Sequence, residues 1–200
     1  MARTTSKVFG EAETYEDLKG IVFQTLLDNN HCYMNETALQ TALSSLQMAS
    51  ESQQKQVLRY ARHIDRKLST PGAARGNAYH KIPAFLAGSI YLINYPETVK
   101  GLTLDELTLL SRYATFEPPE LFEPTAIFFG QELLGAITAK HFDYMFQWTF
   151  LDYAESKLQQ GETKEDVAAY IRDVPIEQLK EEAFEYERKS LQEVGMYLWK

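Results

Sequence analysis

The stretch from Thr125 to Gln160 constrains the fold most, because it is apolar on nearly every side when wound as a helix. A helix at the surface shows one apolar stripe and one polar face, so a helix without a polar face must be covered by others. We therefore expect a buried central helix over about 125–160, with other helices packed around it.

The rest of the chain predicts further helices, because capping signals precede segments with apolar residues at helical spacing. These signals begin at Thr14, Ser50, Thr103 and Thr163. A buried helix is also expected over 82–95, with Pro83 in its first turn. The pattern gives seven to nine helices and no credible sheet. The sequence therefore predicts an all-α protein, a compact bundle around the central helix.

The domain organisation follows from charge and proline content. We expect a loose tail over 1–13, then a helical lobe over 14–115 that includes a basic helix and loop at 52–81. Residues 116–124 (FEPPELFEP) form a Pro-rich bridge, and 125–200 hold the central helix and acidic C-terminal helices. Residues that precede proline avoid the helical region, so part of the bridge must be extended. We expect the lobes to form one domain.

Aromatic and aliphatic side chains of the bridge allow two interpretations. Phe116, Leu121 and Phe122 can cover the core, or they can enter a groove on a partner, as extended Pro-rich segments do. Covering the core is the favoured interpretation.

Composition limits the class of protein. The chain is 44 % hydrophobic and 24 % charged, which is ordinary for a folded domain. Its single cysteine, Cys32, excludes an intrachain disulfide and a metal cluster of cysteines. The N-terminus lacks an apolar signal core, and no apolar run reaches about 18 residues, the length of a membrane span. We expect a soluble, cytoplasmic protein.

A cluster of basic residues is the most unusual feature of the predicted surface. Lys55, Arg59, Arg62 and Arg66 recur at intervals of four, three and four, so they share one face of a helix. Residues 55–81 hold seven Lys or Arg and one Asp, a surplus of six positive charges; since the whole chain carries −8, the remainder carries −14. The candidate residues for binding a partner or phosphate are Lys55, Arg59, Arg62, Arg66, Lys67, Arg75 and Lys81.

Three interpretations of this basic surface remain open. It can dock onto an acidic protein face, including the acidic C-terminal helix of another copy in a homo-oligomer. It can contact nucleic-acid phosphates without reading sequence. It can also be a solvated face without a partner. We favour a non-enzymatic interaction or assembly factor, with a nucleic-acid-associated factor as the alternative.

A small helical enzyme or ligand carrier is the third hypothesis. His141, Trp148 and Glu155 are seven residues apart, hence on one face, and Asp152 lies nearby. This hypothesis predicts an apolar pocket near His141 and Trp148. The sequence lacks an E-x-x-H, an H-E-x-x-H, a Walker loop and a G-x-S-x-G motif. His31 and Cys32 are adjacent without a third orienting group. We therefore expect no metal, no cofactor and no catalytic residue, and a structural His141.

Overall fold

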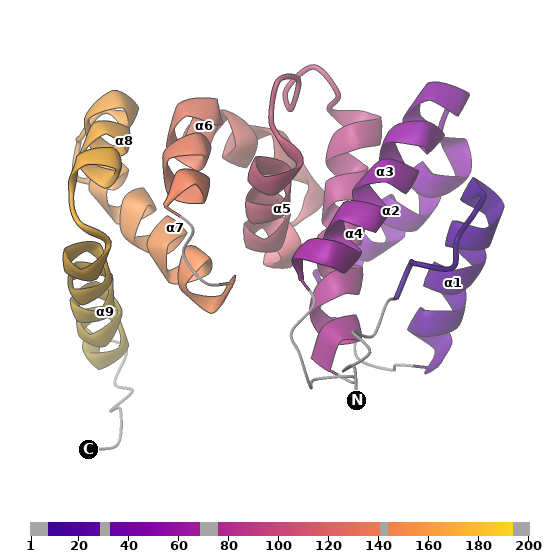
Figure 1. Ribbon diagram of the computed structural model, residues 1–200, viewed down its shortest axis with the longest axis horizontal. Helices are drawn as coiled ribbons and strands as arrows, with labels where there is room; N and C mark the ends of the chain where they lie inside the picture. Colours follow the sequence, from indigo (N-terminus) through magenta and orange to yellow (C-terminus); the bar gives the residue numbers. More distant parts are fainter. Residues whose placement is uncertain (1–7, 29–32, 69–75, 141–143, 194–200) are drawn as a thin grey trace. The chain divides into compact units, whose positions relative to one another are not determined.

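The computed structural model describes residues 8–28, 33–68, 76–140 and 144–193. The all-α prediction is confirmed: these residues form nine α-helices and two short 3₁₀-helices and no strand (Figure 1). The α-helices are α1 (Tyr15–Asp28), α2 (Glu36–Met48), α3 (Glu51–Lys67), α4 (Gly76–Asn94), α5 (Leu104–Tyr113), α6 (Phe122–Ala139), α7 (Tyr144–Gln159), α8 (Lys164–Asp173) and α9 (Ile176–Glu193). The 3₁₀-helices are η1 (Ala114–Phe116) and η2 (Pro119–Leu121).

The predicted capping signals start four of these helices. In each, the backbone N–H of the third helical residue donates to the side-chain oxygen of the cap, which satisfies one of the free donors at a helix start. The pairs are Thr14 with Asp17, Ser50 with Gln53, Thr103 with Glu106, and Thr163 with Asp166. Local sequence therefore sets these boundaries.

The prediction of one continuous helix over 125–160 is wrong. The segment forms α6 and α7, and α6 ends at Ala139, before α7 begins at Tyr144. Inside α6, Gly130 has φ 67° and ψ 167°, which breaks the helix into two parts. This backbone conformation is essentially restricted to glycine, which has no Cβ to clash. The segment is also not covered on all sides, because Ile127 is 59 % exposed.

The chain divides by its internal contacts into two units, residues 1–128 and 129–200. In the first unit, α4 packs against α2, α3 and α5 (Figure 1). Every residue from 81 to 91 is buried, so α4 is the helix that the first unit surrounds. The expected helix over 82–95 begins earlier than predicted, at Gly76, and Pro83 lies in its interior instead of its first turn.

A close approach of α3 to α4 occurs at Gly88. A Cβ placed on Gly88 would lie 2.1 Å from Cε1 of Tyr60, so the tyrosine ring rests directly on the helix backbone. The Tyr60 hydroxyl donates to the Ala84 carbonyl at 3.3 Å. Glycine is required here by packing, since any side chain would displace the ring.

Residues 8–13, expected as part of a loose tail, pack against this core. Phe9 is fully buried, and its ring centroid lies 4.8 Å from that of Phe85. The backbone N–H groups of Val8 and Phe9 donate to the carboxylate of Asp65 at 2.8 and 2.6 Å. Burial of an aromatic ring therefore fixes this segment, which composition alone does not predict.

The bridge is extended before two of its three prolines, whereas Glu123, which precedes Pro124, lies in the first turn of α6. Glu117 and Pro118, each followed by a proline, have ψ values of 147° and 155°, as predicted. Phe122 is fully buried, and its carbonyl accepts a hydrogen bond from the Tyr91 hydroxyl at 2.9 Å. Phe116 and Leu121 are 54 % and 46 % exposed, so covering the core is true of Phe122 and only partly of the other two.

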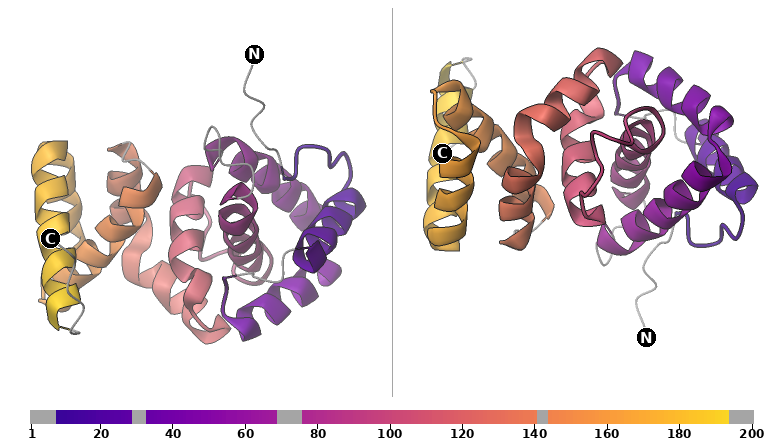
Figure 2. Two further views of the ribbon diagram at one scale, coloured as in Figure 1. Left: turned by 90° about the horizontal axis from the view of Figure 1, so that it is seen from below. Right: turned by 90° about the horizontal axis from the view of Figure 1, so that it is seen from above.

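In the second unit, α7 packs against α8 and α9 (Figure 2). Lys140 holds the end of α8, since its ammonium group donates to the carbonyls of Arg172 and Val174 at 2.7 and 2.9 Å. A cation at the C-terminus of a helix satisfies free carbonyls and complements the helix dipole. Leu179 and Ala183 bury the inner face of α9.

Candidate functional site

Helix α3 separates an apolar face from a cationic face. Its Ser50–Gln53 capping box starts the helix, and its buried side places Val57, Ala61 and Ile64 in the core. The opposite side carries four exposed cations, called here the basic stripe: Lys55, Arg59, Arg62 and Arg66. At about 100° and 1.5 Å per residue, they fall within about 60° of one another and span about 16 Å. Helix α3 therefore buries one face and exposes the other, as the sequence predicts.

The cations of the basic stripe have no acidic partner within the described residues. None of the four side chains forms an ion pair or a hydrogen bond with another residue in the described ranges. By contrast, the following cations elsewhere in the described ranges pair with carboxylates: Lys19, Lys67, Lys81, Lys100, Lys157, Arg172, Lys180, Arg188 and Lys189. The stripe therefore presents hydrogen-bond donors that a partner can use.

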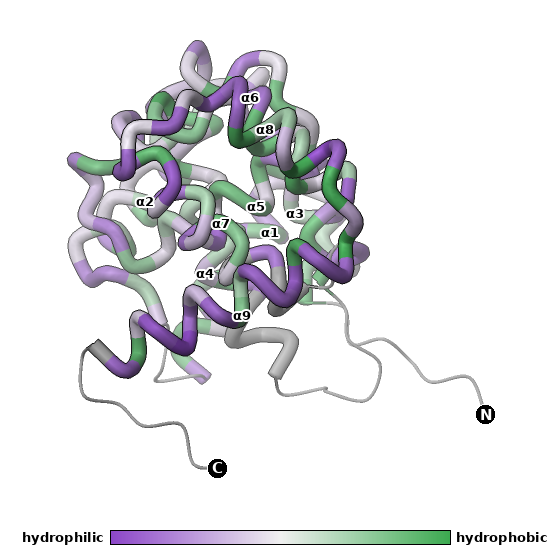
Figure 3. Tube along the Cα trace, turned by 90° about the vertical axis from the view of Figure 1, so that its left-hand side faces the viewer, coloured by the Kyte–Doolittle hydropathy of each residue, from purple (hydrophilic) through white to green (hydrophobic). Residues whose placement is uncertain are grey.

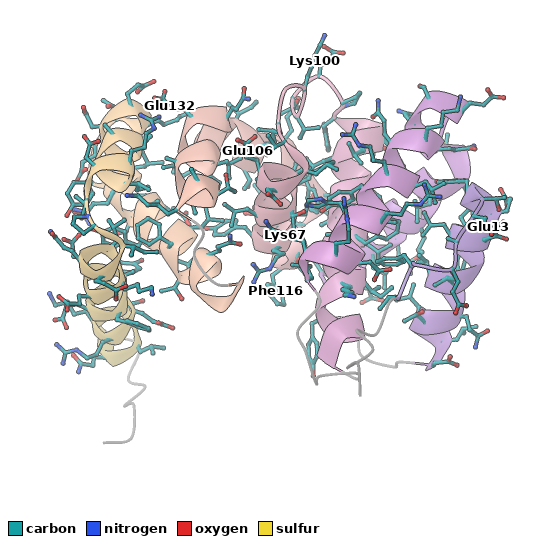
Figure 4. All side chains as sticks on the ribbon, in the orientation of Figure 1. Glu13, Lys67, Lys100, Glu106, Phe116 and Glu132 are labelled. Atoms are coloured by element: carbon teal, nitrogen blue, oxygen red, sulfur yellow. The ribbon has the colours of Figure 1, made fainter. Side chains whose placement is uncertain are left out.

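Lys67 lies at the edge of α3 and has a partner inside the protein. Its ammonium nitrogen is 3.0 Å from Oδ2 of Asp105 in α5. Figure 4 labels the Lys67 side chain. Lys67 is exposed, but its ammonium group already forms an ion pair with Asp105. We therefore place it beside the basic stripe and not within it.

His63 is a neighbour of the stripe that the sequence analysis missed. Its Nε2 lies 3.0 Å from Oδ1 of Asp105, without the alignment of a hydrogen bond. Burial lowers the pKa of His63, the carboxylate of Asp105 opposes this shift, and Arg66 adds to it. The imidazole is therefore mainly neutral at pH 7, and the charge of the stripe comes from Lys and Arg. The sequence could have indicated this position, since His63 lies four residues after Arg59 and is therefore its neighbour on the helix surface.

Lys81 is not part of the surface, contrary to the prediction. It is fully buried, and its ammonium nitrogen lies 2.9 Å from Oδ1 of Asp65, which is also buried. Asp65 lies on the inner side of α3, and a carboxylate there requires a partner. Arg75 lies outside the described residues.

The predicted pocket residues are only partly described. His141 lies outside the described residues, and the side chain of Trp148 is not among those described. Asp152 and Glu155 line a groove of about 330 Å³ between α7 and α9, called here the acidic groove. Its other lining residues are Thr149, Ser156, Gln159, Tyr186, Glu187, Ser190 and Leu191. The groove is polar and acidic. The apolar pocket expected beside His141 falls on residues outside the described ranges and stays a prediction.

A second groove lies in the first unit, between α2 and the end of α4, with a volume of about 590 Å³. Its lining side chains are neutral hydroxyls and amides, apart from Ile93 and Met48. Met48 is 82 % exposed. No motif in the sequence points to this groove, because its residues are common on polar helix faces.

The described part of the chain holds no group of three or more His, Cys, Asp or Glu side chains arranged to bind a metal ion. Among the described helices, none combines the length and apolar character that crossing a membrane requires.

No protein-family model matches the chain, and neither curated proteins nor solved structures are significantly similar to it. The candidate site is therefore identified by geometry and charge.

Proposed function

We propose that this protein is a non-enzymatic interaction factor that docks the basic stripe of α3 onto an acidic face of a protein. One observation carries the proposal. Four neighbouring cations, Lys55, Arg59, Arg62 and Arg66, are exposed on one helix face without an acidic partner among the described residues.

The stripe has an energetic reason to bind anions. Like charges one turn apart on a helix destabilise it by about 0.2–0.5 kcal/mol per pair. The stripe contains three such neighbouring pairs. Carboxylates of a partner placed beside these cations would offset the repulsion with attraction. A single exposed ion pair contributes only about 0–1 kcal/mol, so several must form together. Three of the four cations are arginines, whose planar guanidinium matches a carboxylate in two parallel hydrogen bonds.

A protein partner explains the surroundings of the stripe better than nucleic acid does. Proteins that bind single-stranded nucleic acid use exposed aromatic rings on which the bases stack. The one aromatic residue of α3, Tyr60, is fully buried against Gly88. The whole chain also carries −8, which opposes approach of a polyphosphate. Nucleic acid is the competing partner class that the experiment must test.

The test is binding of a fluorescently labelled Glu-rich helical peptide, measured by anisotropy at low salt and at about 0.15 M salt. A labelled nucleic-acid duplex and a single strand serve as competing probes. The stripe variant carries Arg59→Gln, Arg62→Gln and Arg66→Gln. The control carries Lys19→Gln, Lys100→Gln and Lys180→Gln, which removes the same charge from cations that already pair with carboxylates.

The expected result is peptide binding that the stripe variant weakens about tenfold or more and the control leaves unchanged. Tighter binding of the duplex or the single strand, lost in the stripe variant, would replace the protein partner with nucleic acid. Equal losses in both variants would show that only net charge matters, which would overturn the proposal.

A further inference from the structure

One carboxylate of α5 lies at the edge of the basic stripe. Asp105 places Oδ1 3.0 Å from Nε2 of His63 and Oδ2 3.0 Å from the ammonium nitrogen of Lys67, both on α3. Along α9, by contrast, hydrophilic segments follow one another with hydrophobic residues between them (Figure 3), and Glu177 and Glu185 pair with cations of that same helix. Asp105 therefore connects the cationic helix to a second helix of the first unit.

His63 lies between the basic stripe and Lys67 on the surface of α3. It is four residues after Arg59, three residues before Arg66 and four residues before Lys67, spacings that make residues neighbours on a helix. At about 100° per residue, it lies about 40° from Arg59 on one side and about 40° from Lys67 on the other. A charge on the imidazole is therefore a charge added to the edge of the stripe.

The facing atoms of His63 and Asp105 are enclosed by the protein. Nε2 and Oδ1 are both buried, and neither has an aligned hydrogen-bond partner among the described residues. Burying polar atoms in this state costs free energy, which attraction between an imidazolium and a carboxylate would offset. Asp105 also lies in the first turn of α5, where the helix dipole favours a negative charge. The geometry therefore provides a counter-charge for a protonated His63.

The groups around His63 set the pH at which it takes up a proton. Burial lowers the pKa of His63 below its ordinary value of 6.5, Asp105 opposes this shift, and Arg66 and Lys67 add to it. In residues 81–94 of α4, the charged side chain is Lys81, which pairs with Asp65. The charged residues of α1, which also packs against α3, make contacts of their own: Lys19 with Glu16, Asp17 with the backbone of Thr14, and Asp28 with Gln24.

We propose that His63 is a pH-sensitive switch for the basic stripe, whose protonation strengthens docking onto an acidic protein face. This inference rests on the proposed function and adds its regulation. With a neutral imidazole, the charges of Lys67 and Asp105 cancel, so the cluster of His63, Lys67 and Asp105 carries no net charge. With an imidazolium, the cluster carries one positive charge beside Arg59 and Arg66. The stripe then presents one further charge to the carboxylates of a partner.

The direction of the pH effect follows from the linkage between proton binding and docking. Carboxylates of a docked partner favour the imidazolium, so the pKa of His63 is higher in the complex than in the free protein. Docking therefore takes up a proton, and affinity increases as pH falls through the pKa of the complex toward that of the free protein. Carboxylates of the partner, with ordinary pKa values near about 4.3, stay charged down to about pH 5.5. The interval between about pH 8 and pH 5.5 thus reports on the imidazole.

The experiment measures the Kd of the labelled Glu-rich helical peptide by anisotropy from about pH 8 to pH 5.5, at one low salt concentration. Three variants of the full chain are compared with the wild type. His63→Gln stays polar but takes up no proton, and Asp105→Asn leaves the charge of Lys67 uncompensated at every pH. Lys67→Gln removes one cation and leaves the imidazole facing Asp105. Circular dichroism checks that each variant folds.

The wild type is expected to bind the peptide about threefold to fivefold more tightly at the lower pH, the effect of one further exposed ion pair. His63→Gln should bind equally at both pH values. Asp105→Asn should bind at the higher pH as tightly as the wild type does at the lower. Lys67→Gln should bind more weakly than the wild type and keep its pH dependence.

The same pH dependence in the wild type and His63→Gln would overturn the inference, as would weaker binding by Asp105→Asn than by the wild type at the higher pH. Peptide binding that is lost in the stripe variant (Arg59→Gln, Arg62→Gln, Arg66→Gln) but unaffected by pH would leave the proposed function standing and reject His63 as its regulator. Absence of peptide binding at every pH would reject both.

Discussion

Lys81 places its ammonium nitrogen 2.9 Å from Oδ1 of Asp65, and both side chains are buried between α3 and α4. The same carboxylate accepts the backbone N–H groups of Val8 and Phe9. Asp65 thus joins three segments of the first unit through one side chain. It also fixes the inner face of α3, so the basic stripe necessarily faces outward.

Replacing Lys81 with Met should destabilise the protein by about 3 kcal/mol, because it leaves a buried carboxylate without its cation. Urea unfolding followed by circular dichroism measures this change. The double variant Lys81→Met with Asp65→Leu should lose less than the sum of the two single losses, since no buried charge then remains. Additive losses would contradict an ion pair that acts as a unit.

Gly88→Ala should destabilise the protein by about 1–3 kcal/mol, the usual cost of an overpacked core. The new methyl group would overlap the ring of Tyr60, which must move out of its place between α3 and α4. The matched control is Gly20→Ala in α1, where no atom lies within 4 Å of the new Cβ. That change should stabilise by up to about 1 kcal/mol, because alanine favours a helix. Thermal unfolding of both variants distinguishes the two outcomes.

Glu182 should make stability depend on pH in the acidic range. Burial raises its pKa, but hydrogen bonds from Tyr170, Gln178 and Tyr153 outweigh burial, so the net shift is downward from 4.5. A carboxyl whose pKa is lower in the folded state stabilises the fold above its unfolded pKa. That contribution is lost as pH falls through the folded value.

The Glu182→Gln variant should therefore show a flatter decline of unfolding free energy between about pH 5 and pH 3 than the wild type. Glu181→Gln, at the exposed neighbouring position, serves as the comparison. Both variants would be unfolded in urea across this pH range. A Glu182→Gln curve that follows the wild type, as the Glu181→Gln curve should, would contradict the prediction.

Gly130→Ala should destabilise the protein by about 1–3 kcal/mol, because an alanine at φ 67° and ψ 167° is strained. The nearest atoms to a new Cβ belong to the Lys164 side chain at 3.7 Å, so the cost arises from the backbone and not from crowding. Unfolding measurements test this, with Gly20→Ala again as the comparison. An unchanged unfolding free energy would show that α6 can straighten without cost.

Local signals in the sequence predicted much of the fold. The caps at Ser50 and Thr103 and the exposed positions of Arg59 and Arg62 follow from spacing along one helix. Contacts between residues distant in the sequence could not be predicted, because no local pattern joins Asp65 to Lys81, which lies sixteen residues later.

The helix break at Gly130 was also missed, since a glycine inside an apolar helical pattern is compatible with an unbroken helix. The central helix of the protein was consequently assigned to 125–160. The helix that the first unit surrounds is α4, which the sequence predicted as a further buried helix over 82–95. For the candidate site, the sequence indicated the stripe, but burial of Lys81 depended on tertiary packing.

The most direct test of the basic stripe is protection of its arginines from chemical modification. Phenylglyoxal would be applied to the full chain with and without the Glu-rich peptide, and modified residues would be identified by mass spectrometry. Arg172 and Arg188, which pair with Glu132 and Glu185, provide internal controls. We predict that the peptide protects Arg59, Arg62 and Arg66 and leaves both controls unchanged. Unprotected stripe arginines in the presence of bound peptide would contradict docking through α3.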